Sequence, residues 1–242
     1  MSHWGASVSF LINPYALGTG GGGGPPTFPT LASIWEWWEP SRNSLTPDAA
    51  IANMAGQVAP GAGHDFSRAS GQPIYKDNII NGLGVARFTN QILENVDPSA
   101  LTAAHLFMVV KMVTEGTATG PWKWGTSASA DHYAFTDGNI YDGSLSNTRR
   151  TVGNPTPLLT DWRVVEIIST GTEWTFNLDG TQLFTTGTNT VGITSSCKLG
   201  TNGSNTKDYD FAGGYLCSAK LSGADRTSLI AYINSRFGRS SS

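Results

Sequence analysis

The residues of this sequence best suited to chemistry are aromatic rings with polar side chains nearby. Proteins bind carbohydrates by stacking sugars on exposed aromatic rings, while a few polar groups take the hydroxyls. Asp137 and Asn139 are candidate hydroxyl partners. The candidate rings of a glycan-binding or subunit-interface surface are Trp35, Trp37, Trp122, Trp124 and Tyr141. For each ring, packing in the core is the competing interpretation, because aromatic residues dominate cores and interfaces alike.

The acidic residues do not form a catalytic pattern. Glycosidases need two carboxylates that flank the scissile bond. Glu166 and Glu173 are predicted on the two arms of a hairpin, with no acidic residue between them. A nucleophile elbow, a P-loop and paired His/Cys metal motifs are absent from the sequence. We therefore expect no catalytic residue, no metal and no cofactor.

The first thirty residues differ in composition from the rest. An apolar segment at 8–17, VSFLINPYAL, precedes five consecutive glycines and two prolines, which is a linker composition. An arm that docks on another subunit would bury this apolar surface, and a disordered leader is the alternative. We expect an arm and linker over 1–30 and one domain over 31–242. The candidate arm-interface residues are Phe10, Leu11, Ile12, Tyr15 and Leu17.

Composition narrows the choice of partner and compartment. The net charge is −3 and only 14% of residues are charged, which gives no electrostatic reason to expect nucleic-acid binding. The sequence has neither an apolar run long enough to span a membrane nor a secretory pattern at its start, so we expect synthesis in the cytoplasm. Cys197 and Cys217 are too few for a disulfide framework; reduced thiols are favoured over a bridge.

The elements that must position these residues are strands. The stretch 161–186 predicts two successive hairpins, the second turning at Asp179-Gly180. The apolar run 104–113 predicts a central strand covered on both faces. Alternation over the predicted strand 31–39 places Trp35 and Trp37 on one face. The paired glycines 213–214 indicate a bulge or a close backbone approach. A single helix is predicted from a Ser222 cap to Gly238.

Several of these segments, in this order, resemble a known family. They are IWEWWEPSRNSLT, QPIYKDNIINGLGVARF, HLFMVVKM, WRVVEI, WTFNLDGTQL, KLGTN, DFAGGYLCSAKLS and SGADRTSLIAYINSRFG. Together they resemble the laminin-G-like, concanavalin A-like jelly-roll domain over residues 31–238. The resemblance implies an all-β fold: an antiparallel β-sandwich of the jelly-roll type, here with one short C-terminal helix and an extended N-terminal arm.

The sequence departs from the functional patterns of that family. Calcium-binding members use acidic clusters at loop ends, whereas Asp131, Asp137, Asp142, Asp208 and Asp210 show no assembled ligand spacing. The glycosidase branch carries two glutamates around an aspartate on one strand, and no such motif occurs here. Glycoside hydrolysis is therefore disfavoured.

Two functions without catalysis remain. The first is a virion structural protein of a tailed bacteriophage, most simply a capsid decoration or cement protein whose arm docks on neighbouring subunits; a tail, baseplate or fibre role comes next. Its basis is the low charge, the Gly/Thr/Ser-rich sandwich and a leader, SFLINPYALG, that looks like leaders of phage virion proteins. Its partners would be other virion proteins and copies of itself. The second is a carbohydrate-binding host-recognition module.

Overall fold

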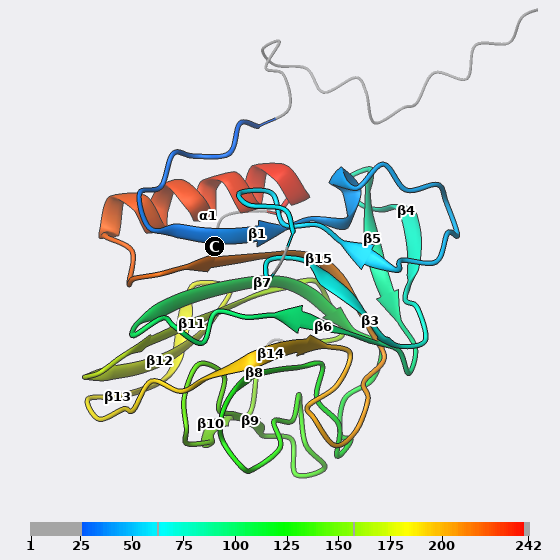
Figure 1. Ribbon diagram of the computed structural model, residues 1–242. Coiled ribbons are helices and arrows are strands. Elements are labelled where there is room, and N and C mark those ends of the chain that lie inside the picture. Colours follow the sequence, from blue (N-terminus) through cyan, green and yellow to red (C-terminus); the bar gives the residue numbers. More distant parts are fainter. Residues whose placement is uncertain (1–25, 62, 157, 240–242) are drawn as a thin grey trace, which may run out of the picture.

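Two antiparallel sheets packed face to face, with one helix over the outer face of the larger sheet, make up the fold (Figure 1). The computed structural model describes residues 26–239 apart from 62 and 157. This arrangement confirms the expected all-β sandwich with a C-terminal helix. The predicted arm residues 10–17 lie outside the described residues.

The large sheet has eight strands in the order β13-β12-β11-β7-β15-β5-β4, with β1 also paired to β15. Its strands are β1 (Ile34–Trp38), β4 (Ile74–Ile80), β5 (Leu83–Phe88), β7 (Ala104–Met112), β11 (Arg163–Thr170), β12 (Glu173–Leu178), β13 (Thr181–Thr186) and β15 (Tyr209–Cys217).

The small sheet has five strands in the order β2-β3-β6-β14-β8, and a separate pair joins β9 to β10. These strands are β2 (Asn53–Met54), β3 (Phe66–Ser70), β6 (Ile92–Val96), β8 (Trp122–Gly125), β9 (Ile140–Asp142), β10 (Arg150–Gly153) and β14 (Ile193–Leu199). The helices are a short 3-10 turn, η2 (Pro40–Arg42), and α1 (Gly223–Phe237).

The central hairpins form as the sequence predicts. Strands β11, β12 and β13 pair consecutively, and β11 also pairs with β7. Asp179 and Gly180 both have positive φ, at 49° and 82°, which is the conformation of a tight two-residue hairpin turn. On β7, Leu106 faces the core between the sheets and Phe107 faces the layer under α1. The strand is therefore covered on both faces, as expected.

Strand β1 contradicts the expected alternation of tryptophans. A bulge lies between Ile34 and Glu36, so Trp35 is an extra residue without a partner on β15. Trp37 consequently packs in the layer under α1, while Trp35 packs with Trp38 against the core between the sheets. The prediction that Trp35 and Trp37 share a face is wrong for this reason. The bulge expected at the paired glycines is confirmed, between Phe211 and Gly213 on β15.

Helix α1 has the predicted caps and covers the large sheet. The Ser222 hydroxyl accepts a hydrogen bond from the Asp225 amide, and Gly238 ends the helix in the left-handed conformation. Phe28, within the segment predicted to be a linker, stacks on Trp37 at 4.6 Å and meets Tyr232 of α1 edge-on at 5.1 Å. The chain is thus already packed on the domain at residue 28.

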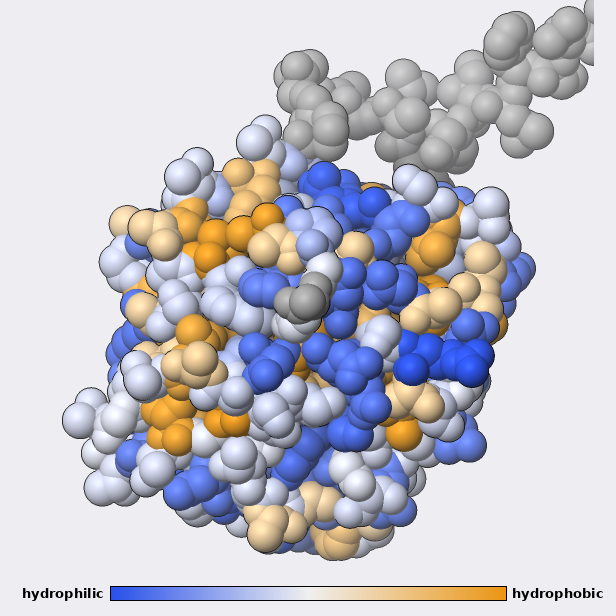
Figure 2. Space-filling model, in the orientation of Figure 1, coloured by the Kyte–Doolittle hydropathy of each residue, from blue (hydrophilic) through white to orange (hydrophobic). Residues whose placement is uncertain are grey.

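The remaining features of the sequence are placed by this layering. Cys197 packs between the two sheets and Cys217 packs under α1, and both are free thiols, as favoured. Within the described residues, no helix is long and apolar enough to span a membrane. On the face shown in Figure 2, hydrophobic side chains gather in separate small patches among polar ones.

Candidate functional site

The structure divides the predicted aromatic surface into buried and half-exposed rings. Trp122 and Trp124 are 0% and 1% exposed, and Trp37 is 9% exposed. These three rings pack in the hydrophobic cores and have no face on which a sugar could stack, which corrects their assignment to a glycan surface. Only Trp35 and Tyr141 of the predicted set are half-exposed.

Trp35 is committed to a structural contact. Its ring stacks on His64 at 4.3 Å and 18°. His64 lies 3.1 Å from the fully buried Glu36 carboxylate, which also accepts backbone N–H bonds from Gln57, Val58 and others of this loop. Glu36 thus holds the loop against β1, and the Trp35 ring packs on this loop through His64.

Tyr141 belongs to a cluster at the opposite side of the molecule from α1, beside β9 and β10 (Figure 1). An isolated antiparallel bridge pairs His132 with Tyr141, and a turn with positive φ at Gly138 returns the chain between them. The half-exposed Phe135 ring stands perpendicular to the Tyr141 ring, with 5.7 Å between centroids. His132 packs against both rings, at 4.7 and 6.2 Å.

Polar groups converge on these rings. The Tyr141 hydroxyl donates to Asp137 Oδ2 at 2.6 Å, and the Asn139 amide N–H donates to Asp137 Oδ1 at 2.9 Å. The Arg149 guanidinium lies over the Tyr141 ring, 5.0 Å from its centroid. We call this cluster the loop patch. Its members are His132, Phe135, Asp137, Asn139, Tyr141 and Arg149.

Electrostatics fix the charges that the loop patch presents. Hydrogen bonds from the Tyr141 hydroxyl and the Asn139 amide lower the pKa of Asp137, so its carboxylate is ionised at neutral pH. Burial, with the nearby Arg149 charge, lowers the pKa of His132, so its imidazole is neutral. The loop patch therefore offers a carboxylate, a guanidinium and a neutral imidazole beside two half-exposed rings.

Two buried carboxylates lie beneath the loop patch. Asp131 and Asp142, the neighbours of His132 and Tyr141, are both 0% exposed. Their donors among the described residues are backbone N–H groups and hydroxyls, as in the 2.8 Å bond from Gly143 N to Asp131. Burial raises the pKa of both carboxyls, and the Asp142 charge raises that of Asp131 further.

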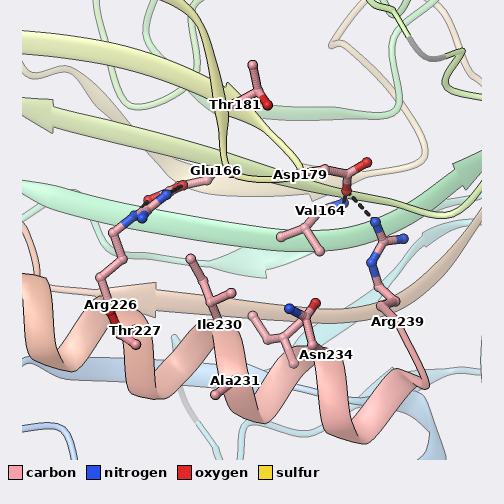
Figure 3. Close-up of a pocket in the computed structure, with 12 residues that line it drawn as sticks. Val164, Glu166, Asp179, Thr181, Arg226, Thr227, Ile230, Ala231, Asn234 and Arg239 are labelled. Atoms are coloured by element: carbon pink, nitrogen blue, oxygen red, sulfur yellow. Dashed lines mark hydrogen bonds and ion pairs between the residues drawn. The ribbon is translucent and has the colours of Figure 1, made fainter. Parts of the chain in front are cut away.

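A cleft lies on the other side of the molecule, between α1 and strands β11 to β13, with a volume of about 480 Å³. Figure 3 shows Arg226 reaching Glu166 at one end and Arg239 paired with Asp179 at the other. We call it the α1 cleft. Its lining residues between the two ion pairs include Val164, Thr181, Thr227, Ile230, Ala231 and Asn234.

The two glutamates of the central hairpins are held in ion pairs. Glu166 accepts bonds from Arg226 at 2.6 and 2.7 Å, His105 at 2.8 Å and Asn177 at 2.9 Å. Burial alone would raise the pKa of Glu166, but the hydrogen bonds from Arg226 and His105 outweigh it and lower the pKa to about 2. Glu173 pairs with Lys220 at 2.6 Å. Among the described residues, no group of three or more His, Cys, Asp or Glu side chains could hold a metal ion.

Sequence reasoning identified half of the loop patch. It named Tyr141, Asp137 and Asn139, which the structure brings together. It missed His132 and the half-exposed Phe135, which lie in the irregular segment between β8 and β9. The adjacent arginines 149 and 150 are a signal that could have pointed to this region.

Comparison with known proteins identifies the fold but no relatives in sequence. No family model matches the chain, and no curated protein matches it significantly. Domain 4 of the extracellular arabinanase AbnA from Geobacillus stearothermophilus, solved with arabinotriose, matches with a TM-score of 0.61 at 14% identity, over 82% of this chain and 98% of that domain.

Two longer proteins match in part. Trypanosoma rangeli sialidase, solved with sialic acid, has a TM-score of 0.53 at 12% identity, over 87% of this chain and 36% of the sialidase. A botulinum neurotoxin type C structure, whose cell entry depends on two ganglioside molecules, has a TM-score of 0.56 at 8% identity, over 84% of this chain and 51% of that one. The chain thus spans about a third and a half of these two proteins. These similarities establish that this chain has the concanavalin A-like β-sandwich fold.

Proposed function

We propose that this chain is a non-enzymatic carbohydrate-binding module and that the loop patch is its glycan site. The observation that carries the proposal is the convergence of two half-exposed rings, Phe135 and Tyr141, with an ionised carboxylate and a guanidinium. Sugar sites combine such rings with a few fixed polar groups that recognise hydroxyls. Asp137 would accept from sugar hydroxyls, and Arg149 would donate to them.

The structural comparisons support this choice over a purely architectural role. The matched structures were solved with arabinotriose or sialic acid or concern ganglioside interaction, so the same sandwich serves proteins that meet carbohydrates. The ion pairs of Glu166 and Glu173 support the non-enzymatic part of the proposal, because a carboxylate held by an arginine or a lysine is a poor proton donor.

The virion role remains a prediction of the sequence. Its basis is the composition and the leader, and residues 8–17 lie outside the described residues. Glycan binding is compatible with it, because a host-recognition module carried on a virion would bind surface glycans of the host.

A glycan array probed with the full chain tests the proposal. We expect binding to a defined set of glycans, and a loss of at least about tenfold in affinity for Phe135→Ala and Tyr141→Ala, since each removes a stacking ring. Phe184→Ala is the matched control, because Phe184 is a half-exposed ring on β13 that packs on Trp174. Thermal unfolding of each variant separates lost binding from lost folding. A flat array, or equal losses in folded Phe184→Ala, would overturn the proposal.

A further inference from the structure

The middle of the α1 cleft is lined by both apolar and uncharged polar side chains, between two ends that carry ion pairs. Val164 forms part of its floor, and Ile230 and Ala231 line it from the helix (Figure 3). Its volume of about 480 Å³ lies within the range of roughly 300–1,000 Å³ that is typical of ligand pockets. The cleft is therefore large enough to take several side chains of a bound segment.

The charged side chains at the two ends of the cleft are ion-paired within the chain, although Arg239 Nε is buried without a hydrogen-bond partner among the described residues. Arg226 pairs with Glu166 at one end, and Arg239 and Arg163 pair with Asp179 at the other. Paired groups of this kind offer little attraction to an ionic ligand. An uncharged occupant therefore matches the cleft better than an ionic one, and residues 8–17, VSFLINPYAL, contain no charged side chain.

The chain approaches α1 from the flank opposite the cleft. Phe28 meets the Tyr232 ring at 5.1 Å and stacks on Trp37. Successive helical residues are rotated by about 100°, which places Tyr232 on roughly the opposite side of α1 from Ile230. A chain that passed from Phe28 to the cleft would therefore have to cross over the helix.

The length of chain before Phe28 is sufficient for this crossing. Ten residues, 18–27, separate the apolar segment from Phe28. Extended, they reach roughly 33–36 Å, whereas a helix with its side chains is about 10–12 Å wide. The glycines at 20–24 allow the sharp changes of direction that such a path needs.

We propose that residues 8–17 dock in the α1 cleft of their own chain and form a strap across helix α1. A linker this short holds the segment at an effective concentration on the order of millimolar, which favours the cleft of the same chain over that of a neighbour. Docking buries the apolar side chains of the segment against Val164 and Ile230. The strap would also cover the Glu166–Arg226 and Asp179–Arg239 pairs.

Cysteine cross-linking in the full chain tests the strap. Ala231 is exposed on the rim of the cleft, and the native thiols Cys197 and Cys217 are buried and do not compete. We expect Ile12→Cys and Ala231→Cys to join under a short bis-maleimide at least about tenfold faster than Ile12→Cys with Thr136→Cys. Thr136 is the matched control, because it is also exposed but lies beside the loop patch.

Two further measurements decide how a cross-link arises. Adding Phe10→Ser and Leu11→Ser to the reactive pair should lower its cross-linking rate to that of the control. These two substitutions change no residue of the domain over 26–239. Mixing isotope-labelled with unlabelled protein should give cross-linked products of unmixed mass. Equal rates for the two cysteine pairs would overturn the strap. Products of mixed mass would also overturn it, since they would place the segment on a second copy.

Discussion

Buried carboxylates occur on both sides of this sandwich, but the two sides treat them differently. On the α1 side, Glu166 is held by Arg226, and Glu39 accepts from Arg236 at 3.0 Å and from the Tyr215 and Tyr232 hydroxyls at 2.7 Å. On the loop-patch side, Asp131 and Asp142 receive bonds from amides and hydroxyls instead. Arginine pairing thus marks one side and neutral donors mark the other.

The difference lies in how each side holds its buried carboxylates. Arg226 joins the helix to Glu166 on β11, and Arg236 joins it to Glu39, which directly follows β1, so these ion pairs fix the layers of the fold. Buried polar atoms without a hydrogen-bond partner among the described residues occur on both sides: Asp131 Oδ2 and His132 Nδ1 by the loop patch, and Arg239 Nε by the α1 cleft. The ion pairs under α1 stabilise the domain, and the loop patch is the site at which we propose glycan binding.

The largest expected loss of stability comes from removing the Arg226–Glu166 ion pair on the α1 side. Arg226→Met leaves Glu166 as a buried charge without its main partner, which should cost about 3–5 kcal/mol of unfolding free energy. Arg149→Met is the matched control on the loop-patch side, where the guanidinium covers a half-exposed ring, and it should cost less than about 1 kcal/mol. Chemical denaturation measures both. Similar losses in the two variants would remove the distinction between the sides.

Acid should weaken the α1 side through Glu166. Because its folded pKa of about 2 lies below its ordinary value of 4.5, the stabilisation is complete above pH 4.5 and is lost as the pH falls through about 2. Each pKa unit corresponds to roughly 1.4 kcal/mol, so Glu166 should account for about 3 kcal/mol over this window. Denaturation of the native chain and of Glu166→Gln from pH 6 to 2 isolates this loss. Parallel stability curves would contradict the assignment.

The smallest expected effect is on the loop-patch side, where the contribution of Asp131 to stability should change with pH in the direction opposite to that of Glu166. Burial and the Asp142 charge raise the pKa of Asp131, so the carboxyl stabilises the fold when protonated and loses that contribution as the pH rises through its folded pKa. Asp131→Asn should therefore raise the unfolding free energy by about 1 kcal/mol at alkaline pH and have less effect in acid. Asp137→Asn is the exposed control and should show no such gain. A loss of stability in Asp131→Asn at every pH would count against this account.

Local patterns in the sequence determined most of the fold. The Asp179-Gly180 turn, the capped helix from Ser222 to Gly238 and the doubly covered strand β7 follow from turn chemistry, capping and periodicity. Such signals depend on residues that are close in sequence, so they can be interpreted without knowledge of the tertiary structure.

The bulge on β1 shows where local patterns fail. One extra residue, Trp35, reverses the faces that alternation predicts for the tryptophans around it. The sequence IWEWW does not reveal this bulge, because the register of β1 is set by its pairing with β15, which lies far along the chain. The burial of Trp122 and Trp124 likewise depends on how the two sheets meet.

The sequence by itself determined that this chain is a sandwich of strands closed by one helix, and that Tyr141 and Asp137 are candidates for recognition. Only the tertiary structure decided which rings reach the surface, because exposure depends on packing between segments distant in sequence. It alone joined Arg149 to Tyr141 and Arg226 to Glu166. Ion pairs and ring contacts form between side chains that the fold brings together, and their spacing in the chain does not encode them.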